Sequence, residues 1–183
     1  CNENASMAKH KMKNIGKIIV VASGKGGVGK STVAANLALT LAKQGYRVGV
    51  MDADIYGPSI HKMFGVENMP VDATYVGEEE YLVPVEKYGL KIISLGLLVD
   101  NSLAVIWRGP MAASALSQLI SKTQWGELDY LVIDFPPGTG DIQISTMQQF
   151  EVDGAIVVTT PQVLAVNDAR KGAEMFSVSK MNV

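Results

Sequence analysis

The sequence lacks the features that mark several classes of protein. A single cysteine, Cys1, excludes an internal disulfide and fits a reducing cytoplasm, where we expect the protein to act. No apolar run approaches the roughly 18 residues of a membrane helix, and the polar segment 1–15 has no signal-peptide core. The net charge of −2 gives no electrostatic reason to expect nucleic acid. We therefore expect neither a membrane nor nucleic acid as a partner.

What is present suits one folded domain. The chain has 183 residues, of which 48% are hydrophobic and 19% are charged. Residues 1–16 show no apolar period and are expected to form a mobile tail, followed by a domain over 17–183. The sequence begins without methionine and stops at Val183, directly after a helix-like stretch. We therefore expect the domain to be truncated at its C-terminus.

Strand-like and helix-like segments alternate along this domain. Short apolar runs predict strands at 17–22, 47–51, 90–95, 130–134 and 155–160. Helical spacing of apolar residues predicts helices at 31–44, 58–64, 111–122, 142–150 and 163–180. The segment 65–87 is rich in glycine, proline and acids, and predicts an excursion with a hairpin near 81–85. The alternation predicts an α/β fold with a mostly parallel sheet and helices on both faces, which binds ligands at the carboxyl ends of the strands.

A phosphate-binding loop follows the first predicted strand. Residues 24–31 match the P-loop pattern of glycine, four residues and Gly-Lys-Ser, and they open the first predicted helix. Glycines let backbone N–H groups surround phosphate oxygens, and the helix N-terminus favours the same anion. Lys30 would reach the terminal phosphates, and the Ser31 hydroxyl would bind Mg²⁺. The sequence therefore predicts ATP and Mg²⁺ as cofactors.

A dinucleotide site is the rival interpretation of the same loop. The fingerprint G-x-G-x-x-G is matched by Gly24, Gly26 and Gly29, and Asp52 lies near the distance expected of a ribose-binding acid. However, a dinucleotide loop needs neither the run Lys30-Ser31-Thr32 nor the extra charge of Lys25. It also does not predict an acid at the end of a later strand. These three features favour the P-loop.

Acidic residues close two of the predicted strands. Asp134 ends the apolar run 130–133 and is expected to hold Mg²⁺ through a water. The residues after it can bring the backbone amide of Gly138 to a γ-phosphate. Asp52 and Asp54 project to the same side of an extended segment, where an acid can orient a water for attack on phosphate. Asp54 is the better candidate for this task, and Asp52 is the better candidate for a structural role.

These motifs resemble a known family. The run Gly24, Lys25, Gly26, Gly27, Val28, Gly29, Lys30, Ser31 and Thr32 resembles the deviant Walker A of the MinD/ParA/nitrogenase-iron-protein group, which is marked by the extra lysine at Lys25. Further stretches are similar to the Mrp/ApbC/Nbp branch of iron–sulfur cluster carriers, namely 52–59, 107–111, 134–141 and 168–172. The similarity extends from about Lys17 to the last residue.

The resemblance implies a weak ATPase that works as a homodimer. Lys25 would cross the subunit interface to the nucleotide of the partner, and Asp54 matches the family's switch I aspartate, so these two residues would be catalytic. Asp134 matches the Walker B acid and Gly138 the switch II glycine. Pro161, within the run 160–162, lies where the family builds part of its adenine pocket.

The resemblance also implies a cargo whose ligands this chain does not show. Family members continue into a strand that ends in Glu-Asn-Met and then into a Cys-x-x-Cys pair, which binds a bridging [4Fe–4S] cluster. This sequence ends before both, so the cluster is expected only in a longer chain, which would deliver it to apo iron–sulfur acceptor proteins. The alternatives are a spatial-positioning ATPase like MinD or ParA, which needs a membrane-binding tail or a basic DNA-binding surface, and a small metabolic ligase. His10 and His61 have no partners at metal-ligand spacing, so we expect surface or packing roles for them.

Overall fold

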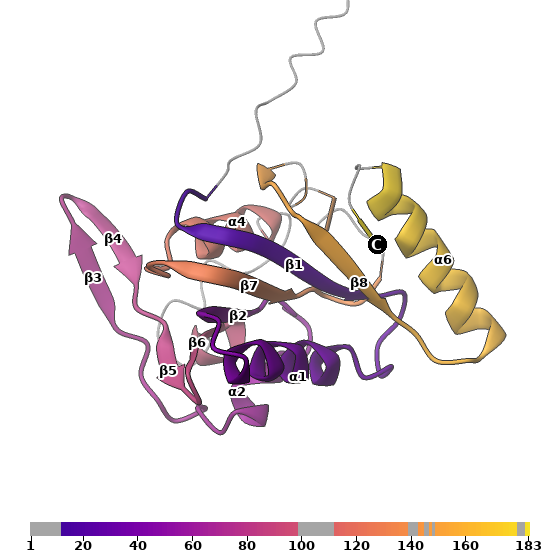
Figure 1. Cartoon of the computed structure of the whole chain (residues 1–183), viewed down its shortest axis with the longest axis horizontal. Helices are drawn as coiled ribbons and strands as arrows, with labels where there is room; N and C mark the ends of the chain where they lie inside the picture. Colours follow the sequence, from indigo (N-terminus) through magenta and orange to yellow (C-terminus); the bar gives the residue numbers. More distant parts are fainter. Residues whose placement is uncertain (1–11, 99–111, 139–142, 145–146, 148, 179–181) are drawn as a thin grey trace, which may run out of the picture.

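The computed structural model describes residues 12–98, 112–138, 143–144, 147, 149–178 and 182–183. Its main feature is a six-stranded sheet, in the order β5-β6-β2-β7-β1-β8 (Figure 1). Along the chain these strands are β1 (Ile15–Ser23), β2 (Val48–Asp52), β5 (Val85–Lys87), β6 (Leu90–Ser94), β7 (Leu128–Asp134) and β8 (Gly154–Val158). All neighbouring pairs are parallel except β5 and β6, which are antiparallel. The mostly parallel sheet is therefore confirmed.

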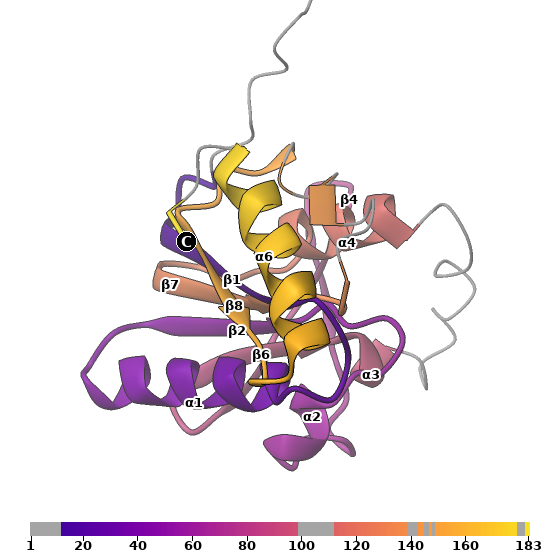
Figure 2. The ribbon, with the colours of Figure 1, turned by 90° about the vertical axis from the view of Figure 1, so that its right-hand side faces the viewer.

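Helices cover both faces of this sheet. The helices α1 (Lys30–Lys43) and α2 (Ile60–Met63) lie on one face, and α4 (Ala112–Ser121) and α6 (Val163–Val178) lie on the other (Figures 1 and 2). Two separate cores result. The first is closed by three alanines of α1, and the second by leucines of α4 and by Phe176 of α6. The helices on both faces confirm the predicted arrangement of layers. Its physical reason is that the strands of a parallel sheet are buried on both faces.

Two predictions about the chain outside these layers were wrong. The hairpin consists of β3 (Ala73–Val76) and β4 (Glu79–Leu82), and it turns at Gly77, not near 81–85. Gly77 adopts a φ of 66°, which glycine reaches without strain. The hairpin extends away from the main sheet (Figure 1). The boundary at residue 16 was also wrong, because β1 begins at Ile15, which is buried and lies inside the segment predicted as tail.

Other predictions fall partly or wholly on residues that the structure does not describe. Within the predicted helix 142–150 the structure describes residues 143, 144, 147, 149 and 150, of which the first four are helical and Phe150 is a β-bridge residue. The run 107–111, Cys1 and His10 lie outside the described residues. Among the helices that are described, none is long and apolar enough to cross a membrane.

The register of the central strands places three polar residues in a row. Asp52 at the end of β2 pairs with Ser94 of β6 on one side and with Asp134 of β7 on the other. Residues in register on parallel strands project to the same face of the sheet. The carboxyl edge of the sheet therefore gathers polar side chains from three neighbouring strands, directly beside the loop that joins β1 to α1.

Candidate nucleotide site at the carboxyl edge of the sheet

The loop between β1 and α1 has the backbone of an anion-binding site. Gly27 and Gly29 have φ angles of 78° and 89°, and a Cβ atom on either would meet nothing within 4 Å. Backbone conformation, not crowding, therefore requires glycine here. Gly29 is the N-cap residue of α1 and provides no side-chain cap. The first amides of a helix have no intrahelical acceptor, and here no capping side chain takes their place, so they are suited to phosphate oxygens.

Gly24 is required for a different reason. A Cβ atom at this position would lie 2.5 Å from the Cβ of Asp168, so a side chain would force α6 away from the loop. The start of the loop is therefore packed directly against α6. This contact joins two of the segments on which the family resemblance rests.

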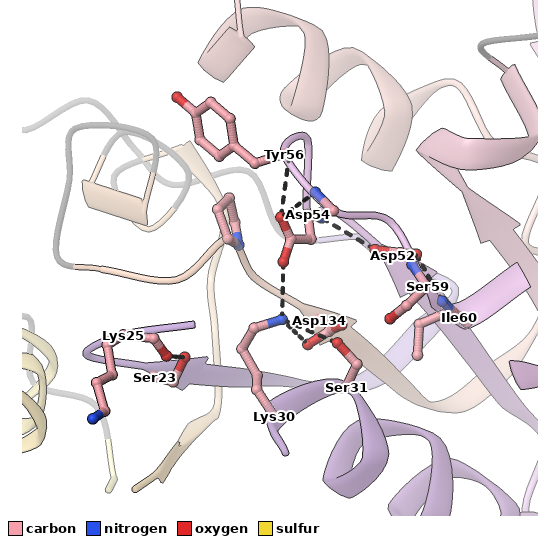
Figure 3. A network of polar contacts seen from close by, with 12 residues as sticks. Ser23, Lys25, Lys30, Ser31, Asp52, Asp54, Tyr56, Ser59, Ile60 and Asp134 are labelled. Atoms are coloured by element: carbon pink, nitrogen blue, oxygen red, sulfur yellow. Dashed lines mark hydrogen bonds and ion pairs between the residues drawn. The ribbon is translucent and has the colours of Figure 1, made fainter. Parts of the chain in front are cut away.

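Lys30 is the centre of the site. Its side chain is only 6% exposed, and its Nζ lies 2.5 Å from Oδ1 of Asp134 and 3.5 Å from Oδ2 of Asp54 (Figure 3). The same Nζ lies 3.3 Å from the hydroxyl of Ser31. The structure thus brings together four residues that the sequence predicted to act on phosphate and Mg²⁺. They come from α1, from the end of β7 and from the loop after β2.

Asp134 has an oxygen that suits a cation. Burial raises the pKa of this carboxyl to about 6, although the neighbouring Lys30 acts to lower it. Its Oδ2 is buried and accepts no hydrogen bond from any described residue. A buried acceptor without a partner is costly, and Mg²⁺ prefers such carboxylate and hydroxyl oxygens. Asp134 and Ser31 therefore fit the predicted magnesium site.

Asp52 and Asp54 have separate surroundings. Asp52 is fully buried and accepts four hydrogen bonds, from the backbone N–H groups of Asp54, Ser59 and Ile60 and from the hydroxyl of Ser94. Asp54 accepts two backbone N–H groups on Oδ1, while its Oδ2 faces Lys30. Asp52 thus holds the loop in place, and Asp54 presents an oxygen to the site.

Other predicted site residues lie outside this cluster. The side chain of Lys25 is exposed and points away from Lys30 (Figure 3). Gly138 has a φ of 103°, and its N–H donates to the carbonyl of Ser23 at 2.8 Å, so it would have to leave that carbonyl to reach a phosphate. Pro161 is exposed after β8, and Thr32 is exposed in the first turn of α1. The arrangement within one chain therefore does not bring these residues to the phosphate site, and their predicted roles stay predictions.

Sequence reasoning missed two residues next to the site. Ser94 donates to Asp52, and His61, expected to have an ordinary packing role, places its Nδ1 3.0 Å from the Ser94 hydroxyl. A signal for Ser94 was present, because it directly follows the apolar pair Ile92 and Ile93 as Asp134 follows the run 130–133. No comparable pattern marks His61.

Comparison with known proteins agrees with this geometry. The family model "ParA: NUBPL iron-transfer P-loop NTPase" matches residues 14–183. An iron–sulfur cluster carrier protein of Pseudomonas fragi is 50% identical over 187 residues, which cover 98% of this chain and 64% of that protein. The chain thus spans less than two thirds of this relative.

Solved structures give the same result. A nucleotide-binding protein of Archaeoglobus fulgidus in complex with ADP aligns with a TM-score of 0.77 at 41% identity, over 93% of this chain and 65% of that one. The cell division ATPase MinD of Pyrococcus furiosus aligns with a TM-score of 0.63 at 23% identity, over 91% and 69%, and shares the fold only. With its loop, its buried lysine and its match over nearly the whole length, the chain belongs to the NUBPL family of iron-transfer P-loop NTPases.

Proposed function

We propose that this chain is the ATPase part of a cytoplasmic iron–sulfur cluster carrier, which binds ATP with Mg²⁺, hydrolyses it slowly and delivers clusters to apo acceptor proteins. The observation that carries the proposal is the group formed by Lys30, Ser31 and Asp134 below an uncapped helix N-terminus. The printed name of the Pseudomonas fragi relative supports the cargo, and the ADP complex of the Archaeoglobus fulgidus protein supports the nucleotide.

The first step of the proposed ATPase reaction follows from the charges around Lys30. Lys30 lies between two carboxylates, and the terminal phosphates of ATP would offer it a stronger concentration of negative charge. When Lys30 moves to the phosphates, Asp134 and Ser31 become available to Mg²⁺, which would neutralise charge on the phosphate oxygens. Asp54 then faces the space that Lys30 has left and orients a water toward the γ-phosphorus, whose bond to the ADP oxygen breaks.

A second copy of the chain would supply a further positive charge to the phosphates. Lys25 is exposed and directed away from its own site, which is the orientation needed to reach the phosphates of a partner. Exposed residues of the loop after β2 and of the start of α6, namely Tyr56, Val163 and Leu164 at 80%, 75% and 76% exposure, provide apolar surface for such a contact. Hydrolysis would therefore depend on dimerisation.

Mixing two inactive variants tests this arrangement. Lys25→Ala is expected to bind ATP within about twofold of the wild type but not to hydrolyse it. The contacts that bind ATP in the ground state are kept, whereas the positive charge that stabilises the transition state is lost. Asp54→Ala is expected to behave in the same way. If Lys25 acts across the interface, an equal mixture should recover about a quarter of the wild-type rate, since half the dimers are mixed and one of their two sites is intact. Lys43→Ala, in an exposed position of α1, is the control. Normal hydrolysis by Lys25→Ala, or no recovery in the mixture, contradicts the cross-dimer role.

The cargo requires a separate test on the full-length protein. After anaerobic reconstitution with iron and sulfide, we expect visible iron–sulfur absorbance and transfer of the cluster to an apo acceptor. Absence of both would overturn the carrier function while leaving the nucleotide site intact. ATP-dependent co-sedimentation with lipid vesicles or DNA would instead favour a positioning ATPase.

A further inference from the structure

A buried chain of three polar side chains lies behind the loop that carries Asp54. Asp52 at the end of β2 and Ser94 at the end of β6 are fully buried, and His61 in α2 is 5% exposed. The Ser94 Oγ lies 2.9 Å from Oδ2 of Asp52 and 3.0 Å from Nδ1 of His61. Neither Ser94 nor His61 has a part in the phosphate or magnesium chemistry described above, although both adjoin it.

The hydrogen bonds fix where the proton of the histidine lies. The single hydroxyl hydrogen of Ser94 is donated to Asp52, and the backbone N–H of Gly96 donates to the same hydroxyl at 3.1 Å. The hydroxyl oxygen therefore has only acceptor capacity left for His61. We therefore assign the tautomer in which Nδ1 carries a proton and donates it to Ser94, so that the chain runs in one direction, from His61 through Ser94 to Asp52.

The imidazole ring is also held by packing. A Cβ atom on Gly96 would lie 2.1 Å from Cε1 and 2.6 Å from Nε2 of His61, so only glycine leaves room for the ring. The backbone carbonyl of His61 accepts the N–H of Val66 at 2.9 Å. The helix α2 has only four residues, too few for stability of its own; the hydrogen bonds of Ile60 with Asp52 and of His61 with Ser94 attach it to the ends of β2 and β6.

Asp52, at the end of this chain, holds both ends of the Asp54 loop. Its Oδ1 accepts the N–H of Asp54 at 3.2 Å, and its Oδ2 accepts those of Ser59 and Ile60 at 2.8 and 2.9 Å. One carboxylate therefore closes the loop 53–59 at its base. Any rotation of that carboxylate would move Asp54, whose Oδ2 lies 3.5 Å from the Nζ of Lys30.

We propose that His61 is a positioning residue for ATP hydrolysis: through Ser94 it sets the orientation of the Asp52 carboxylate, and through Asp52 it holds Asp54 toward the nucleotide. The role of Asp54 rests on the proposed function, whereas the loop clamp formed by His61, Ser94 and Asp52 does not. His61 touches neither nucleotide nor water in this role. Its effect on turnover passes entirely through the loop.

Hydrogen exchange tests the clamp without any enzymatic activity. In His61→Leu and Ser94→Ala, amide exchange in the segment 54–60 should accelerate about tenfold, because Asp52 loses its fixed orientation. Lys62→Leu, an exposed position in the same helix, is the matched control and should exchange like the wild type. Unchanged exchange in both variants would overturn the proposal. Should wild-type hydrolysis prove absent, the proposed function fails, and the exchange result still decides the clamp.

Kinetics separate positioning from mere structural support. We expect His61→Leu to lower kcat about tenfold while the KM for ATP stays within about twofold. His61→Asn should recover most of the lost rate, because its side-chain N–H can occupy the place of Nδ1–H. A wild-type kcat in His61→Leu, or a His61→Asn variant no faster than His61→Leu, would contradict the role.

The wild-type protein offers a test that needs no variant. The chain contains two histidines, so ring resonances in nitrogen-edited NMR are readily divided between His10 and His61. We expect the neutral ring of His61 to carry its proton on Nδ1, with slow exchange due to burial. A neutral ring protonated only on Nε2 would overturn the direction of the chain, and with it the proposal.

Discussion

The two ends of strand β7 carry the same kind of ion pair in opposite surroundings. At the carboxyl end, Lys30 and Asp134 meet at 2.5 Å with side chains 6% and 0% exposed. At the amino end, Arg47 and Asp129 meet at 2.9 Å with side chains 57% and 34% exposed. Both acids have a cationic partner in hydrogen-bonding contact. The main difference between them is access to water.

The two carboxyl groups respond in opposite directions. Burial raises the pKa of Asp134 to about 6 in spite of Lys30, whereas hydrogen bonds from Arg47 lower the pKa of Asp129 to about 2. Desolvation outweighs the effect of Lys30 on the pKa of Asp134, whereas the hydrogen bonds of Arg47 outweigh desolvation at Asp129. The carboxyl edge therefore holds a charge that a ligand can relieve, while the pair at the amino edge is already satisfied. This contrast explains why chemistry is expected at only one edge.

The largest effect is expected from removing the buried cation. In Lys30→Ala, ATP affinity should fall on the order of 100-fold or more, because charge-assisted bonds to the terminal phosphates are lost. Titration with a fluorescent ATP analogue would measure the loss. Lys43→Ala, at the other end of the same helix, should bind normally. If Lys30→Ala binds ATP as the wild type does, the carboxyl edge does not hold the phosphates.

A smaller effect, confined to turnover, is expected from Asp54. Asp54→Asn keeps the shape of the side chain and one acceptor oxygen, so the loop should stay folded and nucleotide binding should remain within about threefold. The hydrolysis rate should fall by about 10²-fold or more, since the charge that orients water is gone. Measurement of phosphate release under saturating ATP would show this. Undiminished turnover would assign the catalytic acid elsewhere.

The pH dependence of nucleotide binding in the presence of Mg²⁺ would sharpen the comparison between Asp134 and Asp129. A proton and Mg²⁺ compete for the Asp134 carboxylate, whose pKa is raised to about 6. The gain in nucleotide affinity from Mg²⁺ should therefore be complete above that pH and should decline as the pH falls through about 6. Asp134→Asn should show little gain at any pH. A gain that persists unchanged well below that value would indicate that the carboxylate does not help to hold the ion.

The smallest effect belongs to the exposed pair. Because the pKa of Asp129 falls from 3.8 to about 2 on folding, its contribution to stability is present above 3.8 and is lost as the pH falls toward about 2. Solvent screens the pair, so Asp129→Asn should lower the melting temperature only slightly at neutral pH and leave nucleotide binding unchanged. Thermal melts at neutral and strongly acidic pH would compare the two proteins. A large loss of stability would mean that exposure does not weaken this pair.

Much of the site could be predicted because its signals are local. The glycines, Lys30 and Ser31 lie in one short run, and Asp134 directly ends a strand whose apolar residues mark it as buried. The hairpin was misplaced because its sequence has several turn-forming residues, and only the pairing of β3 with β4 selects Gly77. The functions of Lys25 and Pro161 stay predictions, since both depend on groups that the single chain does not contain.

The sequence by itself determined the phosphate loop, the alternation of strands and helices, and the acid at the end of β7. Only the tertiary structure decided that Ser94, 42 residues from Asp52, donates to it, and that His61 completes this chain. The strand order β6-β2-β7 brings these residues into register, and no local pattern contains that order. Tertiary structure likewise set the opposite pKa shifts of the two acids: burial raises the pKa of Asp134, and hydrogen bonds from Arg47 lower that of Asp129. Every carboxylate is hydrated in the unfolded chain, and only folding decides which of them lose that water.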